Sequence, residues 1–414
     1  MDEKLIAHSQ VMDWLRRSIL EPHVSRYTAY LCDCRYAKQT QHSYLCAVAH
    51  FAHWLTLKKM SLSQLGDLTV TQFLSHHLPH CHCPDPVLRS APEIRAALRH
   101  LLAVLRTHGV VRHPNGGSLS VELACFDRYM LQVRGLAANT RRQRVLILRR
   151  FLGRQPSGES VDVGKICSAD IRDFVLPNHS PCNAGTVAVL GGALRCYLRF
   201  RALKGDEVQP LLDAVPRAAQ WRLASLPEVL SEQEVHTLLH SFEKLPHSAK
   251  RAYAMVRCLI DLGLRAAEVV RLQLDDINWK EGKIDLPRGK SRRGEILPLP
   301  QATGQAIVDY LRTERPATTN RAVFVRHVAP YDQPIGPGVV QRAVREAYQR
   351  CGWAHSRVHI LRHSLASRLL RQGAPLKEIA DLLRHRSLDT ATIYTKVDGR
   401  RLEAVALPWP GRQL

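Results

Sequence analysis

The segment His359-Ile360-Leu361-Arg362-His363-Ser364 decides how this chain is interpreted, together with two segments that follow it. It predicts the start of a helix. The later segments are Leu382-Leu383-Arg384-His385 and Thr392-Ile393-Tyr394-Thr395, and Tyr394 stands nine residues after His385. Guanidiniums bind anions through paired hydrogen bonds, imidazoles exchange protons near neutral pH, and a phenol can act as a nucleophile. The three segments therefore indicate one site that acts on an anionic group.

Charged residues upstream extend this set. Gly263-Leu264-Arg265-Ala266-Ala267-Glu268-Val269 places an arginine and a glutamate three residues apart. Lys283–Leu286 and Glu295–Leu299 read as two short strands, which predicts a β-hairpin. The turn of this hairpin is basic, since it contains Lys290, Arg292 and Arg293.

Cleavage of a phosphodiester without a metal requires a nucleophile, positive charge for the transition state and an acid for the leaving oxygen. Two arginines can each donate two hydrogen bonds to the non-bridging oxygens, which a lysine cannot do. A tyrosine has an ordinary pKa of about 10, so it needs a base or a positive field. The chain contains no Gly-x-x-x-x-Gly-Lys-Ser/Thr motif, and we expect no ATP requirement.

In this order the motifs resemble those of the tyrosine recombinases, also called the phage integrase family. The resemblance covers residues 228–398 well and 118–212 more loosely. It implies that Tyr394 is the nucleophile, that Arg265 and Arg362 clamp the phosphate and that Lys290 is a general acid. It further implies that the site is completed by His359 and His385 and supported by Glu268. One departure is Leu383-Arg384-His385, because the family often has glycine before this histidine.

The same resemblance implies a mainly helical fold in three parts. Pro- and Gly-rich stretches divide the chain into 1–112, 118–212 and 228–414. The first two parts are expected to be helical bundles, an extra N-terminal one and a SAM-like core-binding domain. The third is expected to be an α+β catalytic domain with a small antiparallel sheet. It opens with a capping box formed by Ser231 and Glu234.

The function implied is site-specific recombination of double-stranded DNA through a 3′-phosphotyrosine and a Holliday junction. Four protomers would assemble on two DNA sites. The reaction would need no cofactor, and the resemblance leaves open whether accessory factors take part. The extra first domain favours an integrase or transposase of a mobile element over a chromosome-dimer resolvase. Two alternatives remain at this point: a type IB topoisomerase, and a non-catalytic DNA-binding protein of the same fold.

The charge of the chain supports a nucleic-acid partner. The 414 residues contain 59 Lys and Arg against 37 Asp and Glu, a formal net charge of +22. A polyanion is the partner that such a surplus favours. On the second bundle, phosphate contacts are predicted for Arg141, Arg142, Arg144, Arg149, Arg150, Arg195 and Arg199, and in the hairpin for Arg292 and Arg293.

Other features of the sequence argue against membrane insertion and export. No stretch approaches the roughly 18 apolar residues that a membrane-spanning helix needs. Acids occur at Asp2 and Glu3, where a signal peptide carries only basic charge. The 11 cysteines are an odd number spread over a long chain. We therefore expect a cytoplasmic protein with mostly reduced thiols.

A cluster of cysteines and histidines in the first part is a weak candidate for zinc. Its thiols are Cys32, Cys34, Cys81 and Cys83, with several histidines nearby. Structural zinc sites prefer two to four residues between paired ligands, and here only one residue separates them. The spacing therefore favours reduced cysteines, and we expect no metal.

Overall fold

The structure is a computed structural model. It describes residues 9–84, 87–111, 118–154, 162–177, 183–218, 227–243, 249–286, 295–385, 387 and 392–397. The chain separates into two compact units, one of Met1–Cys32 and Lys38–Trp221, the other of Asp33–Ala37 and Arg222–Leu414. Each unit is described by itself. Because the first unit contains both helical bundles, the three-domain division remains a prediction. The described chain is mainly helical with one small sheet, as the sequence predicted.

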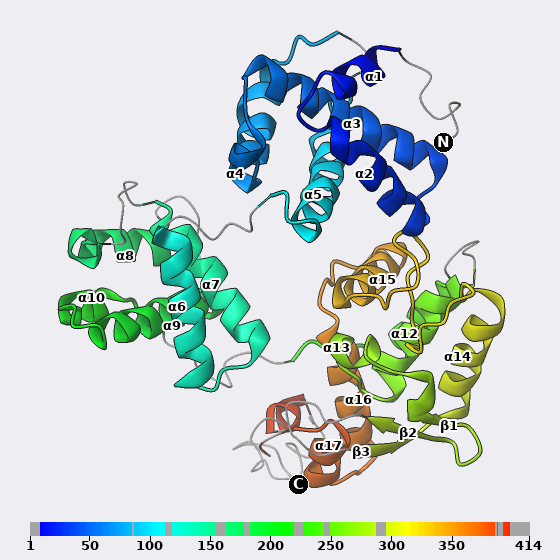
Figure 1. The fold of residues 1–414 in the computed structure, drawn as a ribbon. Helices are drawn as coiled ribbons and strands as arrows, with labels where there is room; N and C mark the ends of the chain where they lie inside the picture. Colours follow the sequence, from blue (N-terminus) through cyan, green and yellow to red (C-terminus); the bar gives the residue numbers. More distant parts are fainter. Residues whose placement is uncertain are drawn as a thin grey trace, which may run out of the picture. The chain divides into compact units, whose positions relative to one another are not determined.

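The first helical bundle is built around one long central helix, α3, Lys38–Leu57. This helix packs against α1 and α5, and α4 also contacts α5. The shared core contains Phe51, Phe73 and Leu98, which are completely buried. The apolar positions of α5 recur every three or four residues, as expected for a helix that buries one face. The other helices are α1 Ser9–Arg16, α2 Glu21–Asp33, α4 Asp67–Gln72 and α5 Ala91–Thr107 (Figure 1).

The second bundle has its own apolar core, which includes Phe126, Leu148 and Phe151. A buried carboxylate, Glu122, accepts hydrogen bonds from Tyr197 Oη at 3.0 Å and Arg201 Nη1 at 2.9 Å. Burial of this charge is tolerated because it is paired. The helices are α6 Ser118–Gln132, α7 Ala138–Leu152, α8 Ser168–Val175, α9 Ala184–Ala202 and α10 Gln209–Ala214.

The last part of the chain combines helices with a three-stranded antiparallel sheet of order β1-β2-β3. Ile284 pairs with Leu297, so both strands of the predicted hairpin are confirmed. The turn that carries Lys290, Arg292 and Arg293 lies outside the described residues. The strands are β1 Ile277–Asn278, β2 Lys283–Leu286 and β3 Glu295–Pro298.

Helix α12, Ala249–Asp261, is central in this part and contacts α14, α15 and α16. Figure 1 shows α16 running from the level of α13 down to α17. Ser231 and Glu234 form the predicted capping box at the start of α11. The remaining helices are α11 Glu232–His240, α13 Ala266–Val269, α14 Gln301–Thr313, α15 Pro337–Arg350, α16 His359–Arg371, α17 Leu376–Leu382 and a 3-10 helix at Thr392–Val397.

The turn after α12 depends on Gly263, whose φ is +59°. An added Cβ would lie 2.7 Å from Leu383 Cδ2 and 3.0 Å from Leu365 Cδ2. Glycine is therefore required twice, once for the left-handed backbone and once for the close approach of these leucines. This turn leads directly into Arg265.

Replacing Gly263 by alanine tests the close approach of the two leucines. Gly282 is the control, because it has φ +61° but no atom within 4 Å of an added Cβ. Gly282→Ala is expected to lower the free energy of unfolding by about 1 kcal/mol through backbone strain alone. Gly263→Ala is expected to lose about 1–3 kcal/mol more, because the methyl group overpacks the turn. Chemical denaturation measures both. Equal losses in the two variants would contradict the predicted clash.

Candidate active site

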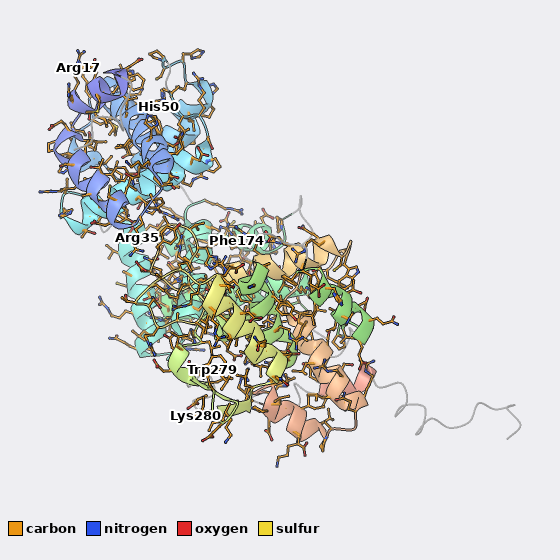
Figure 2. All side chains as sticks on the ribbon, turned by 90° about the vertical axis from the view of Figure 1, so that its right-hand side faces the viewer. Arg17, Arg35, His50, Phe174, Trp279 and Lys280 are labelled. Carbon is orange, nitrogen blue, oxygen red and sulfur yellow. The ribbon has the colours of Figure 1, made fainter. Side chains whose placement is uncertain are left out.

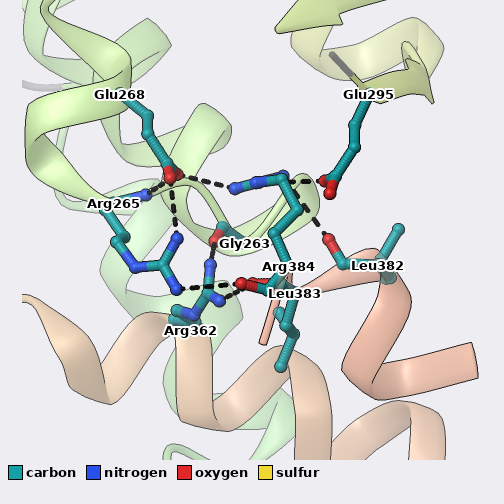
Figure 3. Close-up of polar contacts among 8 residues, drawn as sticks. All are labelled: Gly263, Arg265, Glu268, Glu295, Arg362, Leu382, Leu383 and Arg384. Atoms are coloured by element: carbon teal, nitrogen blue, oxygen red, sulfur yellow. Dashed lines mark hydrogen bonds and ion pairs between the residues drawn. The ribbon is translucent and has the colours of Figure 1, made fainter. Parts of the chain in front are cut away.

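Arg265 begins the short helix α13 and is fixed by Glu268. The backbone N–H of Arg265 donates to Glu268 Oε2 at 2.8 Å, and its Nη1 donates to Glu268 Oε1 at 2.7 Å. The predicted Arg-x-x-Glu motif is thus a capping pair that also orients the guanidinium (Figure 3). Glu268 thus contacts Arg265 through both the backbone and the side chain, and its supporting role stays a prediction.

Arg384 is a second cationic partner of Glu268, which the sequence did not identify. Its Nη2 donates to Glu268 Oε2 at 2.6 Å, and its Nε lies 3.7 Å from Glu295 Oε2. The side chain is only 6% exposed, so Arg384 is a buried ion-pair partner and not a surface charge. Burial alone would raise the pKa of Glu268, but Arg384 and Arg265 hold that pKa below its ordinary value.

The backbone of Arg384 also contributes to the site. Its φ is +54°, a left-handed conformation that glycine would adopt without strain. Its carbonyl accepts a hydrogen bond from Arg265 Nη2 at 3.3 Å. The position where the family often has glycine is therefore a left-handed turn in this chain, and the arginine side chain is used as an ion-pair partner.

Arg362 connects α16 to two turns that are distant in sequence. It is 4% exposed, and its Nη1 and Nη2 donate to the carbonyl oxygens of Gly263 and Leu383 (Figure 3). Burial, with the nearby charges of Arg265 and Arg384, lowers the pKa of Arg362 to about 9. The guanidinium is still charged at neutral pH, so Arg265, Arg362 and Arg384 place three cations close to the half-buried carboxylate of Glu268.

Tyr394 is buried at 1% exposure in the 3-10 helix, which packs on α16. Its hydroxyl lies 3.1 Å from His363 Nδ1, and its ring stacks on His385 with centroids 6.1 Å apart. Burial raises the pKa of Tyr394, while the positive charges of Arg362 and Arg265 oppose that rise. The phenol is therefore within electrostatic reach of both arginines.

His363 is a residue of the site that the sequence prediction missed. It follows Arg362 directly and lies one helical turn from His359, with ring centroids 6.4 Å apart. That spacing was the available signal. Burial and nearby positive charge lower the pKa of both His363 and His385 to about 4, so both rings are neutral at pH 7.

Most of the predicted catalytic set is thus brought together. His359 stands exposed at the start of α16, and His385 is half-buried beside Tyr394. Lys290 lies outside the described residues. The residues that the structure groups at this site are Arg265, Glu268, His359, Arg362, His385 and Tyr394, joined by His363 and Arg384.

The predicted phosphate-binding arginines of the second bundle differ in their environment. Arg141 pairs with Asp127 at 2.5 Å, and Arg195 donates to the carbonyls of Val215 and Pro216 at 3.4 Å. These two have internal structural contacts. Arg144 is half-buried. The arginines that are exposed are Arg142, Arg149, Arg150 and Arg199.

The four cysteines singled out in the first bundle do not form one cluster. Cys32 lies in the last turn of α2, where its Sγ donates to Gln41 Oε1 at 3.4 Å. Cys34 follows that helix and is absent from the one group of possible metal ligands found among the described residues. That group contains Cys81 and Cys83 with two histidines, so Cys32 and Cys34 were wrong members of the set.

Comparison with known proteins identifies the family of this chain. Residues 228–401 match the model of the phage integrase family. The integrase/recombinase-type protein y4rA of Sinorhizobium fredii is 34% identical over 396 residues, covering 94% of each chain. Tyrosine recombinase XerA of Pyrococcus furiosus is 28% identical over 273 residues, covering 66% of this chain and 88% of its own.

Two solved structures share the fold. The XerH site-specific recombinase bound to a palindromic difH substrate gives a TM-score of 0.51 at 18% identity, covering 88% of this chain and 95% of its own. A lambda integrase fragment bound as a dimer to a COC′ core site gives a TM-score of 0.50 at 17% identity. The match covers 71% of this chain and 98% of its own.

In the part of the chain that the structure describes, no helix combines the length and hydrophobicity needed to cross a membrane. The relatives favour recombination over the topoisomerase alternative. From its motifs, its fold and its relatives, we conclude that the chain belongs to the phage integrase family of tyrosine recombinases, and that its function is site-specific DNA recombination.

Proposed function

We propose that the chain cleaves and rejoins DNA through a covalent 3′-phosphotyrosine on Tyr394, without a metal or ATP. The observation that carries the proposal is the position of Tyr394 within the field of Arg265 and Arg362 and against two neutral imidazoles. A phenol with no nearby cation would be a weak nucleophile at neutral pH.

The two arginines bind the scissile phosphate in this proposal. Each guanidinium has five N–H groups, more than the contacts described above occupy. Arg265 is 39% exposed at its side chain and can meet a phosphate that arrives from solvent. Arg362 is more buried than Arg265, and it adds its positive charge from the protein side of the site. Donors that are already oriented stabilise a pentavalent transition state without further reorganisation.

The chemical step is an in-line displacement that conserves the phosphodiester energy. The phenolic oxygen of Tyr394 attacks phosphorus, and the bond from phosphorus to the 5′ oxygen breaks. His363, 3.1 Å from the hydroxyl, is placed to accept the phenolic proton, and Lys290 protonates the leaving 5′ oxygen. His359 and His385 add contacts to the phosphate. Attack by a 5′-hydroxyl from another strand reverses the step and completes the exchange.

The partner in this proposal is duplex DNA with a specific recombination site, bound by four protomers on two sites through a Holliday junction. The similar XerH recombinase is bound to a difH substrate in its structure, and the similar lambda integrase fragment is bound to its core site as a dimer. The +22 charge supports DNA as a partner here as well. We place the reaction in the cytoplasm, at the nucleoid. The proposal keeps the role of an integrase or transposase of a mobile element, and it leaves accessory factors open.

Removing the phenolic oxygen tests the nucleophile. Tyr394→Phe is expected to abolish covalent attachment to a nicked suicide substrate while DNA affinity stays unchanged, because the ring still packs. Denaturing gels detect the adduct, and gel shifts measure binding. Tyr348→Phe is the matched control, since Tyr348 is equally buried but its hydroxyl bonds to the Arg357 carbonyl. A DNA-linked species formed by Tyr394→Phe would place the nucleophile elsewhere.

Lysine in place of arginine tests the phosphate clamp. Arg265→Lys keeps the charge but loses the paired donors, so the cleavage rate is expected to fall about 10²–10³-fold. Arg362→Lys is expected to act in the same direction, with an added loss of stability from its two carbonyl contacts. Exposed Arg312 on α14 supplies the control, Arg312→Lys. Undiminished cleavage by a folded Arg265→Lys protein would remove that residue from the clamp.

The exposed arginines of α7 test the electrostatic part of binding. Removing one arginine that binds a phosphate is expected to reduce the slope of log affinity against log salt by about 0.9. Arg149→Gln with Arg150→Gln should therefore flatten the slope by nearly twice that amount, measured by fluorescence anisotropy between low and physiological salt. An unchanged slope would mean that this face of α7 does not bind DNA.

A further inference from the structure

A group of metal-ligand side chains lies in the first helical bundle, outside the site described above. It consists of His50, His77, Cys81 and Cys83, whose ligand atoms all lie within 4.8 Å of one another. His50 is in the middle of α3 and completely buried, and Figure 2 shows it within this bundle. His77 ends a π-helical turn, Phe73–His77, and the two thiols follow on the next segment.

Three of the distances within the group are close to the edges of a tetrahedron around a zinc ion, and the other pairs lie within 4.8 Å. His50 Nε2 lies 3.3 Å from His77 Nε2 and 3.2 Å from Cys81 Sγ, and Cys83 Sγ lies 3.7 Å from His77 Nε2. Zinc bonds of about 2.0 Å to nitrogen and 2.3 Å to sulfur give tetrahedral edges of roughly 3.3 Å between nitrogens and 3.5 Å between nitrogen and sulfur. The observed separations scatter around these values.

The short spacing of the two cysteines, which argued against zinc at first, has a structural explanation. Cys81 has an extended backbone, with φ −73° and ψ 124°. In an extended chain, residues two apart project to the same side. Cys83 N–H also donates to Cys81 Sγ at 3.4 Å, which holds the two residues close together. One intervening residue is therefore enough to present both thiols to a common centre.

The surroundings restrict the group to a structural role. Aromatic rings pack against the two imidazoles, with Phe73 5.1 Å from His50 and Trp54 6.1 Å from His77 between ring centroids. His50 is completely buried and the other three residues are partly buried, so unsatisfied polar atoms here, above all on His50, carry an energetic cost. Two thiolates would neutralise a dication there, and four protein ligands leave no open position for a substrate.

We propose that the first helical bundle holds one structural zinc ion through His50, His77, Cys81 and Cys83. A tetrahedral site of two nitrogens and two sulfurs selects zinc over the harder divalent cations. The ion attaches the segment that follows the π-helical turn to the buried face of α3. This role is separate from DNA cleavage, which the proposal leaves free of metal.

Metal content of the full chain tests the proposal. Protein produced with zinc in the medium and passed through gel filtration is expected to carry about one zinc ion per chain by elemental analysis. X-ray absorption at the zinc edge is expected to show two nitrogen and two sulfur neighbours. Cys83→Ser and His77→Gln should each lower the zinc content several-fold, whereas Cys32→Ser and Cys34→Ser should leave it unchanged.

Elemental analysis and X-ray absorption of the native protein test the proposal even if the ligand variants do not fold. Absence of zinc after equilibration with excess metal would overturn it, as would an absorption spectrum without sulfur neighbours. Loss of the metal in Cys32→Ser or Cys34→Ser would also overturn it, because these thiols would then be metal ligands. The adduct assay with the suicide substrate is read separately, so failure of the zinc site and failure of the Tyr394 mechanism are distinguishable.

Discussion

The candidate active site depends on one half-buried carboxylate, Glu268. Glu268 accepts from Arg265 and Arg384 at 2.7 and 2.6 Å, and it offsets positive charge that burial would otherwise make unfavourable. Removing this carboxylate would leave Arg384, whose side chain is 6% exposed, with Glu295 at 3.7 Å as its remaining carboxylate partner. The three arginines are therefore held close together by Glu268, by Glu295 and by the carbonyls of the two adjoining turns.

Those carbonyls connect distant parts of the chain. Arg362 on α16 donates to Gly263, which precedes α13, and to Leu383, which follows α17. The left-handed backbone of Gly263 and Arg384 aims the two turns at this guanidinium. Backbone conformation and ion pairing are consequently coupled, since a shift of either turn would displace the arginines that we propose as the phosphate clamp.

Local patterns in the sequence were sufficient for much of this arrangement. The capping box at Ser231, the two strands of the hairpin and the Arg265–Glu268 pair all join residues close in sequence. The partners of Arg384 and Tyr394 were not predictable in this way, because Glu268 and His363 are 116 and 31 residues away. The ligand group around His50 was hidden for the same reason, since the histidine precedes Cys81 by 31 residues.

The burial of Tyr394 has a consequence for when its hydroxyl can meet a phosphate. A hydroxyl on a residue with 1% exposure, bonded to His363, does not meet phosphate esters or reactive small molecules that diffuse through the solvent. In this conformation the phenol that we propose as the nucleophile is therefore withheld from solvent, although Arg265 and Arg362 are already held in place by their internal contacts. The proposed cleavage thus calls for a movement of the 3-10 helix Thr392–Val397 on α16 before the phenol can reach a phosphate.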